Sequence, residues 1–272
     1  MDTLIHAGDA ETRSAAVGYC IYCGATEYRP GTEEPLHDEH VVPEGLGGTL
    51  VLAEASCRQC EQMINPFEQK VIRVNFQMAR LRLGVHRKRR ARNADADALM
   101  VTIQNEDGSE SSARMPPDLA PSLFFLPNFG PPASLIGFGA GILTGYYLHS
   151  FDRVSDMLLR LGSPKGFASP TLDAWAFGRF LAKVAHGYAH YAAFARGPFG
   201  PTLQPLIRGE GTFPDVLAPV GGTGVPPKRA DALHELSLSV QDWGRGPVIV
   251  AHVRLFASLD TPRYAIVVGT NA

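Results

Sequence analysis

The sequence predicts an α+β fold, with a small strand–strand–helix module near the N-terminus and a larger mixed domain after it. The chain has 272 residues, 45% of them hydrophobic, which is enough for a sizeable core in one or two domains. All four cysteines lie in two closely spaced pairs within residues 20–60, and β-branched apolar runs gather near the C-terminus. We place the boundary between residues 1–92 and 93–272.

The elements of the N-terminal module follow one another closely. A strand is predicted around Glu39–Val42, then a turn rich in proline and glycine, then a second strand around Thr49–Leu52. From Glu61 to Leu83 the apolar residues recur every three or four positions, which predicts a helix. Gly84 suits the end of that helix, because glycine accepts a left-handed backbone conformation.

The C-terminal domain is predicted to mix strands and helices. A strand at 99–103 precedes the turn signal Asn105–Gly108, which together indicate a hairpin. A helical pattern covers Leu172–Ala195. Alternating or β-branched runs predict further strands at 233–240, 248–257 and 264–268.

One long uncharged segment, residues 119–151, needs a separate explanation. Its most apolar part, Leu135–Leu148, is shorter than the roughly 20 residues that cross a membrane, and glycines interrupt it. We therefore expect a buried glycine-rich core segment, no membrane contact, and a soluble cytoplasmic protein.

The cysteines form two Cys-x-x-Cys pairs, Cys20 with Cys23 and Cys57 with Cys60. Two intervening residues let one tight turn direct both sulfur atoms at the same ion. Two such turns complete a tetrahedral four-sulfur site, which suits Zn²⁺. A redox pair would need only one such motif, and four ordinary buried thiols are the remaining alternative. We expect a structural zinc site.

Between the pairs lie Glu39-His40-Val-Val-Pro43 and Gly47-Gly48. With the cysteine pairs on either side, this segment resembles the HNH endonuclease family. It is most similar to the bacterial branch in which Cys-x-x-Cys precedes an acidic residue, histidine, two aliphatic residues and proline. The resemblance covers roughly residues 18–70. It implies a zinc-bound ββα-metal module that hydrolyses DNA phosphodiester bonds with Mg²⁺ or Mn²⁺.

The resemblance also implies roles for individual residues. His40 would be the general base that deprotonates water. Glu39 would bind the catalytic metal, although it would point to the opposite strand face from His40, and Asp38 would orient His40. Glu61, Asn65 and Glu68 share one helical face; Glu61, and after it Asn65, is the preferred helix-borne ligand.

One departure from the family pattern keeps two non-catalytic alternatives open. Many members have an asparagine before the second cysteine pair, and this sequence has none between His40 and Cys60. The alternatives are a nucleic-acid-binding zinc module without activity and a zinc-stabilised scaffold for partner binding. The C-terminal domain could read the target, mediate homodimerisation or gate the nuclease.

Charge is distributed unevenly along the chain. The total is −2, yet residues 1–69 hold 12 acidic and 3 basic residues, whereas residues 70–92 hold nine basic residues and no acidic one. We expect this basic run to bind the phosphates of DNA, with RNA as an alternative, and to give affinity without sequence readout. The expected contact residues are Arg73, Arg80, Arg87, Lys88, Arg89 and Arg90.

His186 and His190 have the spacing of a two-histidine metal site on a helix. No carboxylate lies between them, and Tyr188 and Tyr191 are close in sequence. We expect these histidines to pack against aromatic rings rather than to bind a metal.

Overall fold

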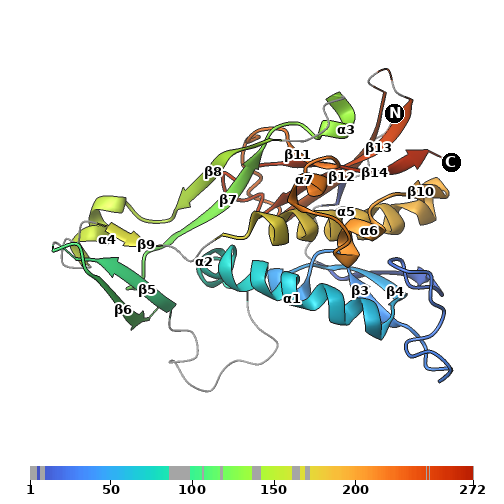
Figure 1. The fold of residues 1–272 in the computed structure, drawn as a ribbon, viewed down its shortest axis with the longest axis horizontal. Helices are drawn as coiled ribbons and strands as arrows, with labels where there is room; N and C mark the ends of the chain where they lie inside the picture. Colours follow the sequence, from blue (N-terminus) through green and yellow to red (C-terminus); the bar gives the residue numbers. More distant parts are fainter. Residues whose placement is uncertain are drawn as a thin grey trace.

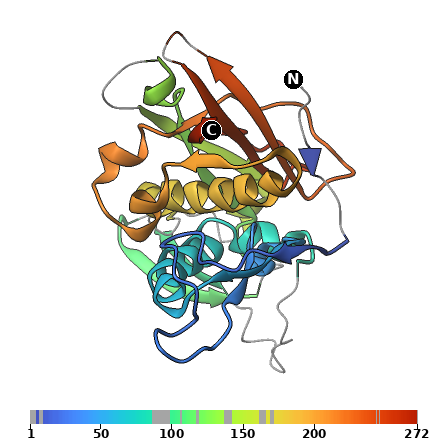
Figure 2. The same cartoon turned by 90° about the vertical axis from the view of Figure 1, so that its right-hand side faces the viewer.

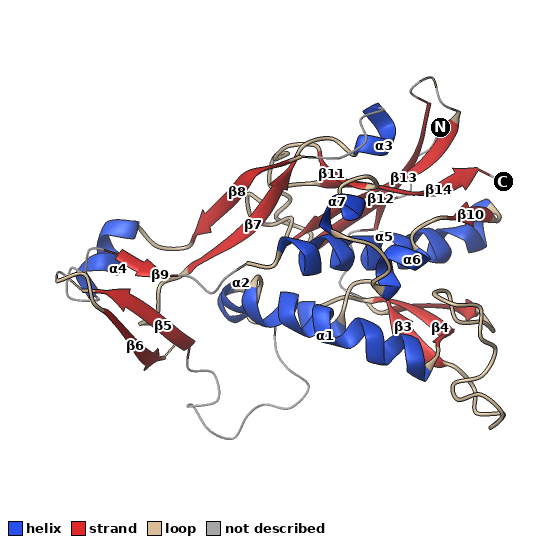
Figure 3. Cartoon of the chain, viewed as in Figure 1, coloured by secondary structure: helices blue, strands red, loops and turns tan. Residues whose placement is uncertain are grey.

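The computed structural model describes residues 5–6, 10–85, 99–105, 107–116, 119–136, 142–160, 166–168, 172–242, 244 and 246–271. Within these ranges the chain is a mixed α/β protein with several sheets and seven α-helices (Figures 1 and 3). The predicted mixture of strands and helices is thus confirmed. None of the described helices is long and apolar enough to cross a membrane.

Residues 10–85, the N-terminal module, contain a three-stranded sheet and the helix that follows it. The strands lie in the order β2 (Thr12–Ala16), β4 (Leu50–Ser56), β3 (His37–His40), and β3 and β4 are antiparallel. A short 3₁₀ turn, Glu44–Leu46, connects β3 to β4. Helix α1 (Arg58–Val74) begins directly after β4, so the predicted strand–strand–helix order is observed.

The predicted single helix over 61–83 is wrong, because the chain forms two helices there. Helix α1 ends at Val74, and α2 (Gln77–Arg82) begins after Phe76. The break places the ring of Phe76, which is fully buried, against those of Phe177, Phe180 and Phe256. Apolar spacing continues through the break and therefore could not reveal it. Gly84 has a φ of 67°, as expected beyond a helix end.

The largest sheet, here called the main sheet, is antiparallel and has the order β1-β12-β13-β14-β10, with β11 also paired to β14. The three long strands confirm those predicted near the C-terminus. The strands are β1 (Ile5–His6), β10 (Phe199–Pro201), β11 (Val220–Gly222), β12 (His234–Asp242), β13 (Pro247–Leu255) and β14 (Tyr264–Asn271).

Helix α5 (Ala174–Arg196) lies between the main sheet and the N-terminal module (Figure 2). Its carboxylate N-cap, Asp173, accepts a hydrogen bond from the backbone N–H of Ala176 at 2.9 Å. Phe177, Phe180 and Tyr188 are fully buried, and one hydrophobic cluster joins α5 to α1, β4 and the main sheet. The predicted boundary at residue 92 falls outside the described residues and stays a prediction.

A second part of the chain extends away from this core (Figure 1). It contains a three-stranded sheet, in which the hairpin predicted around the turn Asn105–Gly108 is confirmed. A two-stranded hairpin connects this part to the core, and its buried side chains Phe124, Leu126 and Phe129 belong to the core cluster. The elements of this second part are β5 (Leu99–Gln104), β6 (Glu110–Met115), β7 (Leu123–Phe129), β8 (Leu143–Ser150), α4 (Val154–Arg160) and β9 (Gly166–Ala168). The remaining short helices are α3 (Ala133–Ile136), α6 (Gln204–Arg208) and α7 (Phe213–Val216).

The expectation of a buried core segment at Leu135–Leu148 is met at Leu135, which is 7% exposed, but is wrong for the part of it that lies in β8. Residues 137–141 of this segment lie outside the described residues. Alternate residues of this strand face solvent, and Tyr146 and Leu148 are about half exposed, at 50% and 46%. A two-stranded hairpin has two faces, and only one of them packs on the rest of the chain.

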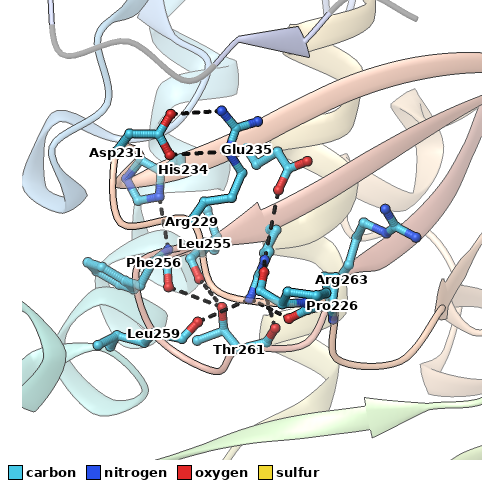
Figure 4. Close-up of polar contacts among 12 residues, drawn as sticks. Pro226, Arg229, Asp231, His234, Glu235, Leu255, Phe256, Leu259, Thr261 and Arg263 are labelled. Carbon is cyan, nitrogen blue, oxygen red and sulfur yellow. Dashed lines mark hydrogen bonds and ion pairs between the residues drawn. The ribbon is translucent and has the colours of Figure 1, made fainter.

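The loops at one end of the main sheet meet around Pro226, Leu259 and Thr261 (Figure 4), and a buried arginine holds them together. Arg254, on β13, is 1% exposed and donates to four backbone carbonyl oxygens. The acceptors are Pro226 (2.9 Å), Pro227 (2.6 Å), Leu259 (3.1 Å) and Thr261 (3.2 Å). The guanidinium thereby satisfies carbonyls that the turns leave without a strand partner.

A buried histidine joins the 3₁₀ turn of the N-terminal module to the main sheet. His234 Nε2 donates to the carbonyl oxygen of Leu46 at 2.8 Å, and its Nδ1 accepts the N–H of Phe256 at 3.3 Å. These two contacts require the neutral imidazole. Burial lowers the pKa of His234 to about 4.

We expect Arg254→Met to lower the free energy of unfolding by at least about 3 kcal/mol, because each buried carbonyl left unsatisfied costs about 1–3 kcal/mol. Urea unfolding of the purified variants measures this loss. Arg229→Met is the control, since Arg229 pairs with Asp231 at the surface, and we expect no measurable change. Equal losses in the two variants would contradict the role given to Arg254.

We expect His234→Gln to reduce the acid sensitivity of the fold. The folded pKa lies below the unfolded value of about 6.5, so unfolded chains bind the proton first and stability is lost as pH falls from about 6.5 to 4. Glutamine keeps an N–H for Leu46 but does not titrate. Urea unfolding at pH 7, 6 and 5 should show that the free energy of unfolding of His234→Gln falls less steeply with falling pH than that of wild type, by up to about 1.4 kcal/mol per pH unit. An unchanged slope would refute this assignment.

Candidate functional site

The four cysteines lie together, as predicted. Cys20 and Cys23 lie in the turn after β2, Cys57 is the N-cap of α1, and Cys60 is in its first turn. Their sulfur atoms all lie within 4.8 Å of one another, and Cys23 Sγ is 3.6 Å from Cys57 Sγ. Two sulfurs bound at about 2.3 Å to a tetrahedral ion are separated by about 3.8 Å. The cluster therefore fits a zinc ion.

The thiols have contrasting proton affinities. A hydrogen bond with Cys60 lowers the pKa of Cys20 to about 5, whereas burial raises the pKa of Cys57 to about 11. The pKa of Cys60 is also raised, by its hydrogen bond with Cys20 and by burial. Four thiolates at such short separations repel one another, so their joint ionisation needs a cation among them.

His40 lies at an open pocket with a volume of about 900 Å³. The pocket is bounded by β3, the 3₁₀ turn, α1, α2 and α5. Nδ1 of His40 is buried and has no hydrogen-bond partner among the described residues. The lining residues are Asp38, Glu39, His40, Pro43, Glu44, Gly45, Glu68, Gln69, Ile72, Arg73, Gln77, Arg80 and Lys183.

At the inner wall of the pocket, the carboxylates of Glu39 and Glu68 face the ammonium of Lys183. Lys183 Nζ is 2.6 Å from Glu39 Oε1 and 3.1 Å from Glu68 Oε2. Burial raises the pKa of Glu39, and Glu68 adds to this effect while Lys183 opposes it. Burial alone would lower the pKa of Lys183, but the two carboxylates raise it, so this lysine stays charged.

The structure brings three of the predicted catalytic residues to the pocket, namely His40, Glu39 and Asp38. Glu39 and His40 differ in exposure, as expected for neighbours on a strand: Glu39 is buried and His40 is partly buried. Asp38, expected to orient His40, pairs with Arg13 Nη2 at 2.6 Å and accepts the N–H of Glu54 at 3.3 Å.

The preferred helix-borne ligands lie elsewhere. Glu61 accepts a hydrogen bond from the Tyr28 hydroxyl at 2.8 Å and contacts His37 Nδ1 at 3.2 Å, near the cysteine cluster. Asn65 is exposed, and neither Glu61 nor Asn65 is among the described residues that line the pocket. Glu68, one helical turn further along the same face, is the α1 carboxylate that meets Glu39.

Lys183 is the site residue that sequence reasoning missed. It is 143 positions from His40, so no local motif could connect them. One signal was present, because Lys183 is a single charge within the apolar stretch from Phe180 to Ala185. A lone charge on an apolar helix face requires a buried partner.

Some residues of the basic run at 70–92 make contacts within the chain. Lys70 pairs with Asp173 at 2.6 Å, and Arg82 contacts Ser122 and Asp152. Arg73 is exposed and lines the pocket, whereas Arg80 lines it but is buried. Arg87, Lys88, Arg89 and Arg90 lie outside the described residues.

His186 and His190 pack against aromatic rings, as predicted. His186 stacks on Tyr22, and His190 makes edge contacts with Tyr19 and Phe199. His186 Nε2 also bonds the carbonyl of Ile21 at 2.8 Å, which joins α5 to the first cysteine turn. Burial lowers the pKa of His186 to about 4 and that of His190 to about 3.

The pocket does not offer a ready site for Mg²⁺ or Mn²⁺. Mg²⁺ needs near-octahedral oxygen ligands at about 2.0–2.1 Å. Asp38 is paired with Arg13, and Lys183 lies between Glu39 and Glu68, where a shared ion would bind. Within the described residues, the metal-ligating side chains that lie close enough in a group of three or more to share an ion are the four cysteines, and not the carboxylates of the pocket.

Comparison with protein-family models, with curated proteins and with solved structures gives no match to this chain.

We expect the purified protein to contain one zinc ion per chain and Cys57→Ser to lose it, with a large fall in the free energy of unfolding. Structural zinc contributes about 10–16 kcal/mol in small peptides, and serine preserves the N-cap of α1. Metal analysis and urea unfolding measure the two effects. Ser56→Ala, at the neighbouring buried position, should retain the zinc. If neither wild type nor Cys57→Ser contains zinc and the two proteins are equally stable, the cysteines are four ordinary thiols and the zinc site is refuted.

Proposed function

We propose that this chain is an HNH-type endonuclease that hydrolyses DNA phosphodiester bonds at the pocket around His40. The observation that carries the proposal is the position of His40, at the end of β3 and open to a pocket of about 900 Å³ that it shares with Arg73. The strand–strand–helix order, with a cysteine pair on either side of the hairpin, is the arrangement expected of that family.

The chemistry at this pocket is hydrolysis of a phosphate ester. The His40 imidazole accepts a proton from water, an oxygen–phosphorus bond forms, and the bond to the leaving oxygen breaks. The leaving oxygen then takes up a proton from solvent water, and His40 releases its proton to solvent, which restores the neutral imidazole. Arg73, an exposed cation at the same pocket, is placed to stabilise the negative charge that develops on the phosphate. The pocket is large enough for one nucleotide.

The zinc ion has a structural role in this proposal. The four cysteines would occupy all four of its positions, which leaves none for water or substrate. Zinc would fix the turn before β3 to the start of α1, and so hold the two walls of the pocket in register. No step of hydrolysis is assigned to it.

DNA is the proposed partner, with RNA as the alternative nucleic acid. Phosphate contacts from Arg73 and from the basic segment that follows α2 would give binding that weakens as salt rises. Because such contacts do not read bases, target preference would have to come from another surface of the chain.

A nucleic-acid-binding zinc module without activity is the second candidate. The observation that favours it is the pairing of Asp38 with Arg13 and of Glu39 and Glu68 with Lys183. Carboxylates held in this way are not free to take a catalytic metal. This candidate predicts binding that does not depend on His40.

We expect full-length protein to nick supercoiled plasmid and His40→Ala to lose the activity by about 10²–10⁴-fold, the usual contribution of a general base. His37→Ala is the matched control, because His37 lies on the same strand but faces Glu61, away from the pocket. Gel quantification of nicking and a salt titration of DNA binding are the two measurements. Salt-dependent binding without nicking would support the second candidate, and activity retained in His40→Ala would overturn the catalytic assignment.

A further inference from the structure

The ammonium of Lys183 has a full set of acceptors in the protein interior. It donates to the carbonyl oxygen of His40 at 2.7 Å, in addition to its contacts with Glu39 and Glu68. A lysine ammonium has three N–H donors, so the three acceptors use all of them. The residue is 1% exposed, and its position is therefore determined by these partners.

The three acceptors belong to the two walls of the pocket. Glu39 and His40 are on β3, Glu68 is on α1, and Lys183 reaches both from α5. The ammonium thus performs the task that a bound cation performs between two carboxylates. It neutralises their repulsion and fixes the strand that carries His40 relative to the helix.

A divalent ion would have to displace this ammonium to reach both carboxylates. Removing one partner of a buried ionic group is strongly unfavourable, because the other charges are left uncompensated. A hydrated Mg²⁺ ion, which also gives up its water reluctantly, is a poor competitor for such a position.

We propose that Lys183 is the built-in cation of this site and takes the place of the divalent ion that the HNH resemblance implies. Lys183 is a positioning residue: it is too buried to contact a phosphate, and it acts by holding Glu39, Glu68 and the backbone of His40. Activity at the pocket then needs no added Mg²⁺ or Mn²⁺. The activity part of this inference rests on the proposed function, whereas the metal-binding part does not.

The first experiment is a calorimetric titration of the zinc-loaded full-length protein with Mn²⁺, up to millimolar concentrations. We expect no Mn²⁺ binding to wild type and one bound Mn²⁺ in Lys183→Ala, in which the two carboxylates are released. Lys183→Ala with Glu68→Gln should lose that ion again. Lys228→Ala, which breaks an exposed lysine–aspartate pair of 2.9 Å, is the control and should bind none.

Binding of Mn²⁺ at the pocket of wild type, abolished by Glu68→Gln, would overturn the proposal whether or not the protein has nuclease activity. If Lys183→Ala does not fold, the wild-type titration decides the question alone, with Lys183→Arg as the variant that retains the charge.

The second experiment compares plasmid nicking with and without added Mg²⁺, after metal analysis has shown that zinc is the metal present. We expect equal rates for wild type, and for Lys183→Ala a loss of about 100-fold from misplacement of His40. Added Mn²⁺ should restore part of that loss. If wild type nicks DNA only with added Mg²⁺, the proposal that Lys183 replaces the divalent ion is refuted. If no nicking occurs under any condition, the nuclease function is refuted, and the Mn²⁺ titration alone then tests the metal-binding part of the proposal.

Discussion

The burial of one ammonium with two carboxylates is the constraint on which the candidate site depends. Moving an ion from water into a protein interior costs several kcal/mol, and only well-placed partners offset this. Lys183 meets that condition because β3, α1 and α5 converge on it from three directions. Displacement of any one of these elements leaves an uncompensated charge. The geometry of the pocket therefore depends on the packing of the core around α5.

Helix α5 makes this convergence possible because it is almost wholly enclosed. It packs against α1 and β4 on one side and β13 and β14 on the other, and its Phe177 contacts the rings of Phe76 and Tyr264. Two of its polar side chains, Lys183 and His186, reach the backbone of the N-terminal module, at His40 and Ile21. Apolar burial supplies the stability of this arrangement, while these directed contacts set the orientation of the module on the helix.

Much of the local structure could be predicted from the sequence, because it depends on short-range patterns. The cysteine spacing predicted the cluster of Cys20, Cys23, Cys57 and Cys60, and alternation or β-branching predicted the long C-terminal strands. Longer-range effects could not be seen. The break before α2 exists because Phe76 enters a core built from distant segments, and Glu39 meets its partner only through α5. The motif favours Glu61, yet Glu68, two turns further along α1, is the residue that lines the pocket, and only the packing of α1 against β3 and α5 decides this.

The distance along the chain between His40 and Lys183, 143 residues, has a consequence for biosynthesis. A ribosome adds about 5–20 residues per second, so many seconds separate the emergence of the hairpin from that of α5. During that interval the cysteine turns and the hairpin exist without the ammonium that anchors Glu39 and the backbone of His40. The nascent N-terminal module therefore lacks the contacts that hold Glu39 and the backbone of His40 in place until α5, which ends at Arg196, has been made.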